Sequence, residues 1–261
     1  MSYQDLLYEE RDGVVTITIN RPQVYNAFRA QTCEELIAAF VQAGGNSQIG
    51  VIVLAGAGDK AFCSGGDQGG QASGGYGGRG ALGMPIDQVH SLIRDVPQPV
   101  IARVQGFAIG GGNVLATICD LTIASDRAVF GQVGPKVGSV DPGFGTAYLA
   151  RIVGEKKARE MWYLCRRYSA TEALAMGLVN VVVPHDELDA EVGRWCGELM
   201  ERSPTALAIA KRSFNADTES IRGSGALGFQ AVALYYQTEE HKEGSAAFHE
   251  KRKPDFRRFV R

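Results

Sequence analysis

The stretch PVIARVQGFAIGGGN, residues 99–113, joins a run of β-branched residues to a glycine cluster. Residues 100–104 are typical of a buried strand, and the segment that follows Asn113 has helical spacing. Glycine at such a junction lets the backbone approach a ligand closely, and N–H groups at a helix N-terminus can converge on a developing oxyanion. A tight turn with close packing is the alternative, which the spacing alone favours.

A second glycine cluster, FCSGGDQ at residues 62–68, follows VIVLAGAG in the same way. Strand-like runs recur along the chain, and helical segments separate most of them, which predicts an α/β architecture. These runs are residues 14–19, 51–54, 100–104, 121–124 and 179–183. Capping-box spacing predicts helix starts at Thr32 with Glu35 and at Ser169 with Glu172.

From about residue 186 the pattern becomes helical, with a helix expected to begin near Pro204 and a glycine-rich break at residues 223–228. The break spells GSGALG, which formally matches the dinucleotide-binding fingerprint. It follows a helical stretch rather than a strand, so we do not expect a nucleotide there.

Composition narrows the functional classes. The 261 residues are 45% hydrophobic with a net charge of -2, which suits one large globular domain and gives no reason to expect nucleic acid as a partner. The basic tail KRKPDFRRFVR, residues 251–261, is predicted to be solvated, with contact to CoA phosphates or to nucleic acid as the alternatives. With no targeting segment and no long apolar run, we expect a cytoplasmic protein without membrane contact. The five scattered cysteines predict buried reduced thiols, and no metal site is indicated.

Five motifs together carry a resemblance to a known family. They are NRP at residues 20–22, NAF at 26–28, AFCSGGD at 61–67, G-x-x-x-GGG at 106–112 and FGQ at 130–132. In order and spacing they are similar to the crotonase (enoyl-CoA hydratase/isomerase) superfamily. The resemblance implies a crotonase (ClpP-like) ββα spiral core over residues 1–200 and a helical C-terminal trimerisation or lid region over 201–261. It also implies self-association as a trimer or hexamer.

The same resemblance implies an enzyme that acts on an acyl-CoA substrate and has no tightly bound cofactor. The backbone N–H groups of Gly66 and Gly111 would form its oxyanion hole. The two glutamates of the hydratases correspond here to Val114 and Gly134, so simple alkene hydration is not expected. Another group must act as the acid and base.

Asp141, which precedes Pro142, reads from its neighbours as a helix N-cap. The surrounding stretch GQVGPKVGSVDPGFG resembles that of 2-ketocyclohexane-1-carboxyl-CoA hydrolases and 1,4-dihydroxy-2-naphthoyl-CoA synthases, where the matching aspartate is catalytic. The two roles can coexist, because a helix N-terminus favours the anionic carboxylate that a base requires.

Further site residues follow from this resemblance alone. Tyr236, Tyr76 and Ser139 are assigned to catalysis, with Tyr76 in a glycine-rich loop, residues 69–83, that is expected to act as a lid. For Tyr236 the alternative is packing or subunit contact. Residues expected to bind the CoA moiety are Tyr25, Ala27, Ser64, Gly65, Asp67, Gln68, Phe107, Ile109 and Lys251. A bicarbonate ion replacing the missing glutamate would be held by Gln132, Gly134 and Trp162, although Trp162 is equally typical of a core residue.

Departures from the synthase pattern at Tyr25, Asn113 and Val133 favour the hydrolases. The activity so implied is hydrolytic carbon–carbon cleavage of 2-ketocyclohexane-1-carboxyl-CoA to pimeloyl-CoA, as in anaerobic degradation of alicyclic and aromatic acids. The first alternative is the synthase reaction, ring closure of o-succinylbenzoyl-CoA. A non-catalytic acyl-CoA-binding protein is an alternative of another class.

Overall fold

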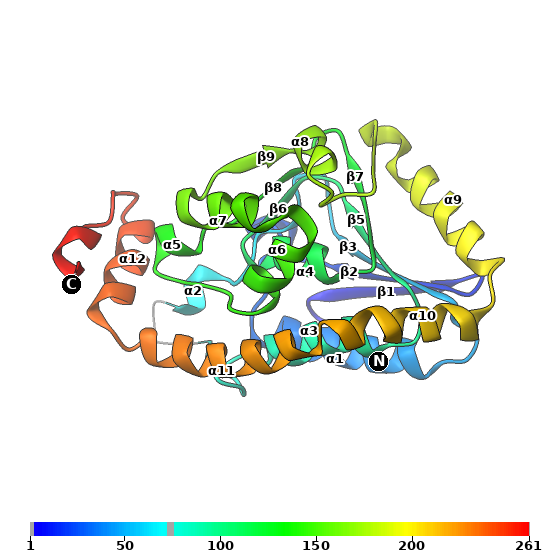
Figure 1. The fold of residues 1–261 in the computed structure, drawn as a ribbon, viewed down its shortest axis with the longest axis horizontal. Helices are drawn as coiled ribbons and strands as arrows, with labels where there is room; N and C mark the ends of the chain where they lie inside the picture. Colours follow the sequence, from blue (N-terminus) through cyan, green and yellow to red (C-terminus); the bar gives the residue numbers. More distant parts are fainter. Residues whose placement is uncertain (1–2, 72–75, 261) are drawn as a thin grey trace.

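The computed structural model describes residues 3–71 and 76–260 and shows two β-sheets with helices around them (Figure 1). The larger sheet contains β1 (Leu6–Arg11), β2 (Val14–Ile19), β3 (Val51–Gly56), β5 (Val100–Val104), β7 (Leu121–Ser125) and β10 (Val181–Val183). The smaller sheet contains β4 (Ala61–Cys63), β6 (Phe107–Ile109), β8 (Val129–Gly131) and β9 (Arg167–Ser169). Within the described ranges the spatial orders are β1-β2-β3-β5-β7-β10 and β4-β6-β8-β9.

The chain winds through the two sheets in repeated steps. In the pairs β3–β4, β5–β6 and β7–β8, the first strand joins the larger sheet and the second joins the smaller one. Each strand lies parallel to its counterpart in the next pair. A helix follows each pair. The predicted α/β fold with its ββα winding is confirmed.

Helices cover the sheets and form the whole C-terminal region (Figure 1). The α-helices are α1 (Ala30–Gly45), α2 (Gln68–Gln71), α3 (Ile86–Asp95), α4 (Gly111–Ile118), α5 (Gly134–Val137), α6 (Leu149–Val153), α7 (Glu155–Leu164), α8 (Ala170–Ala175), α9 (Leu188–Met200), α10 (Pro204–Asp217), α11 (Glu219–Tyr235) and α12 (Glu239–His249). The 3-10 helices are η1 (Pro22–Val24), η3 (His185–Glu187) and η4 (Phe256–Phe259), and η2 (Phe144–Tyr148) is a π-helix. Within the described ranges, none of the helices is long and apolar enough to span a bilayer.

Alternating side chains of the central strands supply two cores. Val51 and Val53 of β3 pack with residues of α9, whereas Ile52 and Leu54 belong to the main core with α1 and α3. All six residues of β3 are buried because both faces of this parallel sheet are covered. The five cysteines are also buried, as predicted.

Two sequence predictions about the C-terminal region have different outcomes. The helix start at Pro204 is confirmed, with Ser203 accepting a hydrogen bond from the N–H of Ala206. The predicted break at residues 223–228 is wrong, because α11 continues through it. A Cβ atom on Gly228 would lie 2.4 Å from Cβ of Pro142. The glycines therefore allow a close approach of α11 rather than interrupt it.

The predictions for two other helix starts and for the basic tail also differ in their outcomes. Ser169 and Glu172 form the predicted capping box, but α1 begins before Thr32, whose hydroxyl accepts from the N–H of Arg29. In the tail, Arg252 and Arg258 both pair with Glu243 of α12, so the tail is folded onto the helix rather than fully solvated.

Candidate active site

Three loops follow parallel strands of the smaller sheet and meet at the carboxyl ends of those strands. Strands β4, β6 and β8 run in the same direction, so the loops at residues 64–66, 110–111 and 132–134 leave from the same end. Ligands of parallel sheets bind where such carboxyl ends converge. The winding of the chain therefore creates the site.

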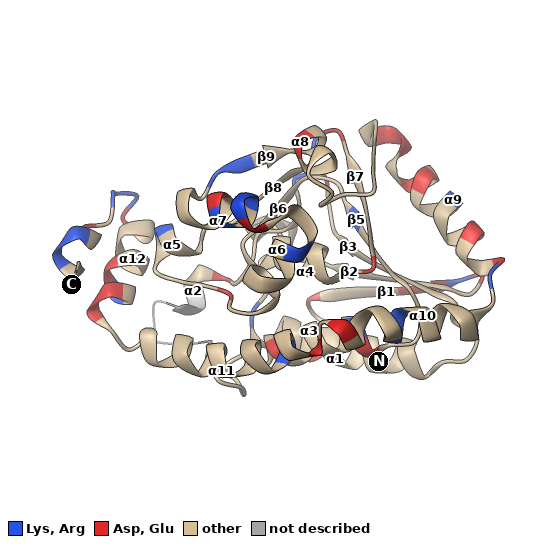
Figure 2. Ribbon diagram, viewed as in Figure 1, with Lys and Arg blue, Asp and Glu red and all other residues tan. Residues whose placement is uncertain are grey.

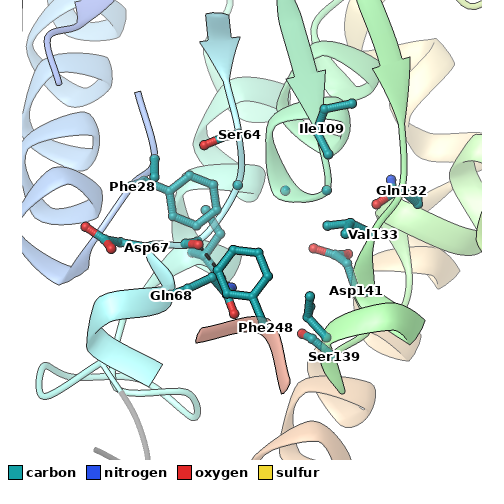
Figure 3. A pocket seen from close by; sticks show the side chains of 18 of the residues that line it. Phe28, Ser64, Asp67, Gln68, Ile109, Gln132, Val133, Ser139, Asp141 and Phe248 are labelled. Carbon is teal, nitrogen blue, oxygen red and sulfur yellow. Dashed lines mark hydrogen bonds between the residues drawn. The ribbon is translucent and has the colours of Figure 1, made fainter. Parts of the chain in front are cut away.

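A cavity lies at these carboxyl ends (Figure 3). Its volume of about 710 Å³ is typical of a small-molecule site. It is lined by every predicted site residue except Lys251, which is exposed in the turn after α12. The predicted residues brought together are Tyr25, Ala27, Ser64, Gly65, Gly66, Asp67, Gln68, Tyr76, Phe107, Ile109, Gly111, Gln132, Gly134, Ser139, Asp141, Trp162 and Tyr236. Lining the cavity does not by itself assign a catalytic or binding role to any of these residues.

The two glycine clusters pack directly on each other. Gly65 has a φ of 95°, and a Cβ atom there would lie 3.0 Å from the Gly111 nitrogen, so a side chain at this position would be both strained and obstructed. Gly111 is the first residue of α4, where the helix offers its N–H no partner. Among the described residues, neither the Gly66 nor the Gly111 N–H has a hydrogen-bond acceptor.

Phe28 fixes the direction of the Gly66 N–H. The Phe28 N–H donates to the Gly65 carbonyl at 2.9 Å, and the Asp67 N–H donates to the Phe28 carbonyl at 2.8 Å. Gly66 lies between these paired groups, and in extended backbone successive N–H groups point to opposite sides. The Gly66 N–H is thus left for a ligand.

Asp67 and Asp141 are the carboxylates among the described residues that line the cavity, and they differ in their partners. Asp67 forms a salt bridge with Arg21 at 2.9 Å and accepts the Gly69 N–H at 3.1 Å. Figure 3 shows its carboxylate directed away from the centre of the cavity. Asp67 therefore holds the glycine loop together, and its charge is already paired.

Asp141 points into the cavity from the opposite side (Figure 3). Its carboxylate accepts the Gly145 N–H at 3.1 Å. Burial raises the pKa of Asp141 to about 7, and the Gly145 hydrogen bond opposes that rise. The N-cap prediction is wrong by two residues, because the helix that follows begins at Phe144 with Gly143 as its N-cap. The carboxylate nevertheless contacts the first turn of that helix.

Tyr236 lies at the C-terminal end of α11 and lines the same cavity as Asp141. Its hydroxyl is 2.7 Å from the Ser139 hydroxyl. The ring stacks on His241 at 4.2 Å between centroids, and His241 Nδ1 lies 2.8 Å from the Gly138 carbonyl oxygen. These contacts hold the two hydroxyl groups together in the cavity that Asp141 also lines.

Tyr76 approaches the cavity from the glycine-rich loop. A Cβ atom on Gly66 would lie 2.2 Å from the Tyr76 hydroxyl oxygen, so this hydroxyl packs directly over one oxyanion-hole residue. Burial raises the pKa of Tyr76 well above its ordinary value, which keeps the hydroxyl protonated and able to donate. The predicted lid also includes residues 72–75, which lie outside the described residues.

The three residues predicted to hold bicarbonate do not fit that role together. The Gln132 amide is buried with neither its oxygen nor its nitrogen bonded within the described part of the chain, so it could accept a polar ligand. The Trp162 indole N–H, however, already donates to the Gly145 carbonyl oxygen. We therefore derive no step through bicarbonate.

Arg167 and several apolar residues also line the cavity, and they were not predicted from the sequence. Arg167 stands opposite Gly131 because β9 runs antiparallel to β8, and its guanidinium lies 5.5 Å from the centre of the Phe107 ring. Figure 2 shows the basic residues at this end of β9. A signal was available in the CRRY sequence, but nothing in it indicated the antiparallel pairing. The apolar residues in the lining include Leu82, Met84, Ile86, Val137 and Phe229.

Comparisons with known proteins agree with this geometry. A family model described as enoyl-CoA hydratase/isomerase matches residues 9–258. An enoyl-CoA hydratase from Mycobacterium avium subsp. paratuberculosis K-10 superposes with a TM-score of 0.87 at 31% identity, covering 98% of this chain and 99% of its own. An enoyl-CoA hydratase/isomerase from Pseudoalteromonas atlantica T6c gives 0.87 at 26% identity over 97% and 100%. By its sequence and its fold, this chain belongs to the enoyl-CoA hydratase/isomerase family, the crotonase superfamily.

Proposed function

We propose that the protein hydrolyses a carbon–carbon bond in a cyclic β-keto acyl-CoA, with 2-ketocyclohexane-1-carboxyl-CoA as substrate and pimeloyl-CoA as product. One observation carries the proposal. Among the described residues, Asp141 is the cavity carboxylate without a cationic partner, and it faces the cavity that holds the two N–H groups with no acceptor in that part of the chain. Its pKa is about 7. A group with such a pKa can take and return a proton at physiological pH.

In the proposed reaction, Asp141 removes a proton from water while the hydroxide adds to the ring ketone. The resulting alkoxide collapses and breaks the bond between the former ketone carbon and the carbon α to the thioester. The electron pair becomes a thioester enolate whose oxygen is held by the N–H groups of Gly66 and Gly111. The ketone carbon becomes a carboxylic acid at the far end of the same chain. The proton that Asp141 took from water passes to the α carbon, directly or through the Tyr236 hydroxyl, which regenerates the base and completes the product with its thioester intact.

Tyr236 supports the second half of this sequence. Its hydroxyl, oriented by Ser139, would supply the proton or hold the ketone oxygen before cleavage. The apolar residues that line the cavity suit a saturated ring. Val114 and Gly134 offer no carboxylate for hydration of a double bond. The paired and oriented groups around Asp141 also favour an enzyme over a non-catalytic acyl-CoA-binding protein.

Ring closure of o-succinylbenzoyl-CoA is the second candidate, since the same oxyanion hole and Asp141 could serve it. The indole N–H of Trp162 is bonded within the protein, which is against a bicarbonate-assisted reaction of this kind. We therefore rank the ring-opening reaction first.

Self-association as a trimer or hexamer through the region 201–261 is part of the proposal. Helices α10 and α11 expose large apolar side chains that a second copy would cover. These side chains are Ile209, Phe214, Leu227 and Leu234. Because the substrate is an acyl-CoA, we place the activity in the cytoplasm.

Labelled water tests the chemistry. Turnover of 2-ketocyclohexane-1-carboxyl-CoA in H₂¹⁸O should place one ¹⁸O atom in the new carboxyl group of pimeloyl-CoA, and no free CoA should be released. Mass spectrometry of the intact thioester reads the label. Release of free CoA with the ring intact would show thioester hydrolysis instead, and would contradict the proposal.

A further inference from the structure

Trp162 is held in the wall of the cavity by contacts on two sides of its ring. It lies on α7, and 6% of its surface is exposed. Its indole N–H donates to the Gly145 carbonyl oxygen. A Cβ atom on Gly134 would lie 2.9 Å from Cζ3 of the indole, so the edge of the ring packs on bare backbone. The indole therefore has one orientation, with its N–H directed at Gly145.

Gly145 connects this indole to Asp141. While its carbonyl oxygen accepts from Trp162, its N–H donates to Asp141 at 3.1 Å. A Cβ atom on Gly145 would lie 2.8 Å from Cβ of Asp141, which means that only glycine fits this close approach. Gly145 belongs to the π-helix η2, a wide turn that leaves backbone groups free for such contacts.

We infer that Trp162 is a positioning residue for Asp141, which acts by fixing the Gly145 backbone whose N–H binds the carboxylate. The inference rests on the proposed function of Asp141. It replaces the bicarbonate role suggested for Trp162 by family resemblance, because one N–H cannot serve both partners well. Trp162 does not contact the substrate in this account.

The expected direction of the change in the pKa of Asp141 follows from which form of its carboxyl group accepts the Gly145 N–H. The Gly145 N–H stabilises the ionised form of Asp141, and burial destabilises it. Loosening Gly145 would weaken the hydrogen bond and raise the pKa of Asp141. Since the proposed base must be ionised, activity at neutral pH would fall and would return at higher pH.

Other titratable groups near Asp141 do not set this pKa. Around the same cavity they are Tyr76 from the glycine-rich loop, Tyr236 and the His241 behind it, Asp67, Arg167 of β9 and His249 of α12. Burial and the Gly145 N–H are the causes of the shift at Asp141. A change in its pKa on altering Trp162 without changing the burial of Asp141 would therefore report on Gly145.

The test is Trp162→Phe, which removes the N–H and keeps an aromatic ring. The acid limb of kcat/KM against pH should move upward by as much as about one pH unit. The loss at pH 7 should be up to about fivefold, since the pKa of Asp141 starts near 7, and should largely disappear at pH 9, with KM changed much less. Trp195→Phe is the matched control, because Trp195 makes the same kind of bond to Glu191 on α9, away from the site. Its pH profile should match the wild type.

A second measurement does not depend on turnover or on the stability of that variant. The chain has two tryptophans, so Trp195→Phe leaves one indole N–H signal, that of Trp162, in a ¹H–¹⁵N spectrum. We expect this signal to be unchanged by bicarbonate. In the same background, biosynthetic replacement of Trp162 by its benzothiophene analogue keeps both rings without the N–H and should reproduce the pH shift.

A bicarbonate-dependent shift of the indole signal, or an unmoved acid limb in both N–H-deficient proteins, would overturn the inference. These outcomes leave the proposed function intact so long as Asp141→Asn is inactive. Activity in Asp141→Asn would instead remove the proposed function, whatever Trp162 does.

Discussion

The cavity has two walls of different kinds. Backbone N–H groups form one wall, and side chains form the other. The backbone wall consists of residues 64–66 and 110–111, whose N–H groups meet because two parallel strands end together. The side-chain wall consists of Ser139, Asp141 and Tyr236, which are held by η2, α11 and α12. In the proposed mechanism, the first stabilises the oxyanion of an acyl thioester, whereas the second determines which bond breaks. The contrast shows how one fold can serve several reactions.

Asp141→Asn should have the largest effect and would break the side-chain wall. Loss of the proposed base should lower kcat/KM by about 10²- to 10⁴-fold, while acyl-CoA binding remains. Steady-state kinetics and calorimetric titration measure the two quantities. Asp186→Asn, an exposed change on η3, should be neutral. Wild-type turnover in Asp141→Asn would remove Asp141 from the mechanism.

The same variant should also change the pH dependence of stability. The folded-state pKa of Asp141, about 7, lies above its ordinary value of 3.8, so the folded protein binds a proton that the unfolded chain has lost. The stability contributed by this group is present below pH 4 and is lost as the pH rises towards 7. At pH 8, Asp141→Asn should therefore unfold at a higher temperature than the wild type.

Gly111→Ala should be next in size and would break the backbone wall. The added Cβ atom would lie 2.6 Å from Cζ of Phe28, so the loop must shift and the N–H must leave its position. Losing one oxyanion donor should lower kcat by about 10²- to 10³-fold. Gly193→Ala on α9, where a Cβ atom meets nothing within 4 Å, is the control and should retain activity. Equal activity in the two variants would argue against the oxyanion hole.

Tyr236→Phe should have a smaller effect on kcat. It separates the role of Tyr236 from that of Asp141 within the side-chain wall. Removing the hydroxyl that meets Ser139 should lower kcat by about tenfold or more while Asp141 remains in place. Tyr235→Phe provides the control one residue earlier. An unchanged kcat in Tyr236→Phe would restrict this tyrosine to packing.

Arg167→Ala should have the smallest effect, since this cation lies at the edge of the cavity on Phe107 rather than beside the reacting atoms. We expect KM for a CoA thioester to rise about fivefold, the loss of one exposed charge interaction, with kcat unchanged. KM for a pantetheine thioester, which lacks the nucleotide phosphates, should not move. Arg166→Ala is the control, because the Arg166 side chain pairs with Glu160. A rise in KM for both thioesters would argue against phosphate contact.

The backbone wall could largely be predicted from the sequence, since glycine clusters after strands leave few conformations and the family motifs fall on them. The strands at 14–19 and 100–104 were predicted with their observed bounds. The smaller sheet was not, because β4, β6, β8 and β9 are three residues each and too short to show alternation. Arg167 was missed for that reason.

The side-chain wall depends on long-range contacts that local patterns do not contain. The glycines at 225 and 228 suggested a break, but they serve contacts with Pro142 and Gly143 some eighty residues away in sequence. Asp141 read as an N-cap because Pro142 is typical of a first helical position, whereas the π-helix starts two residues later. Trp162 gave no sign that its N–H is directed at Gly145.

The most direct test of the account is mass-spectrometric analysis of products after separate incubations with 2-ketocyclohexane-1-carboxyl-CoA and o-succinylbenzoyl-CoA. We expect the first to gain one water and become pimeloyl-CoA, and the second to remain unchanged. Loss of water from o-succinylbenzoyl-CoA, with no change in the cyclic ketone, would contradict the assignment and show that the side-chain wall closes rings rather than opens them.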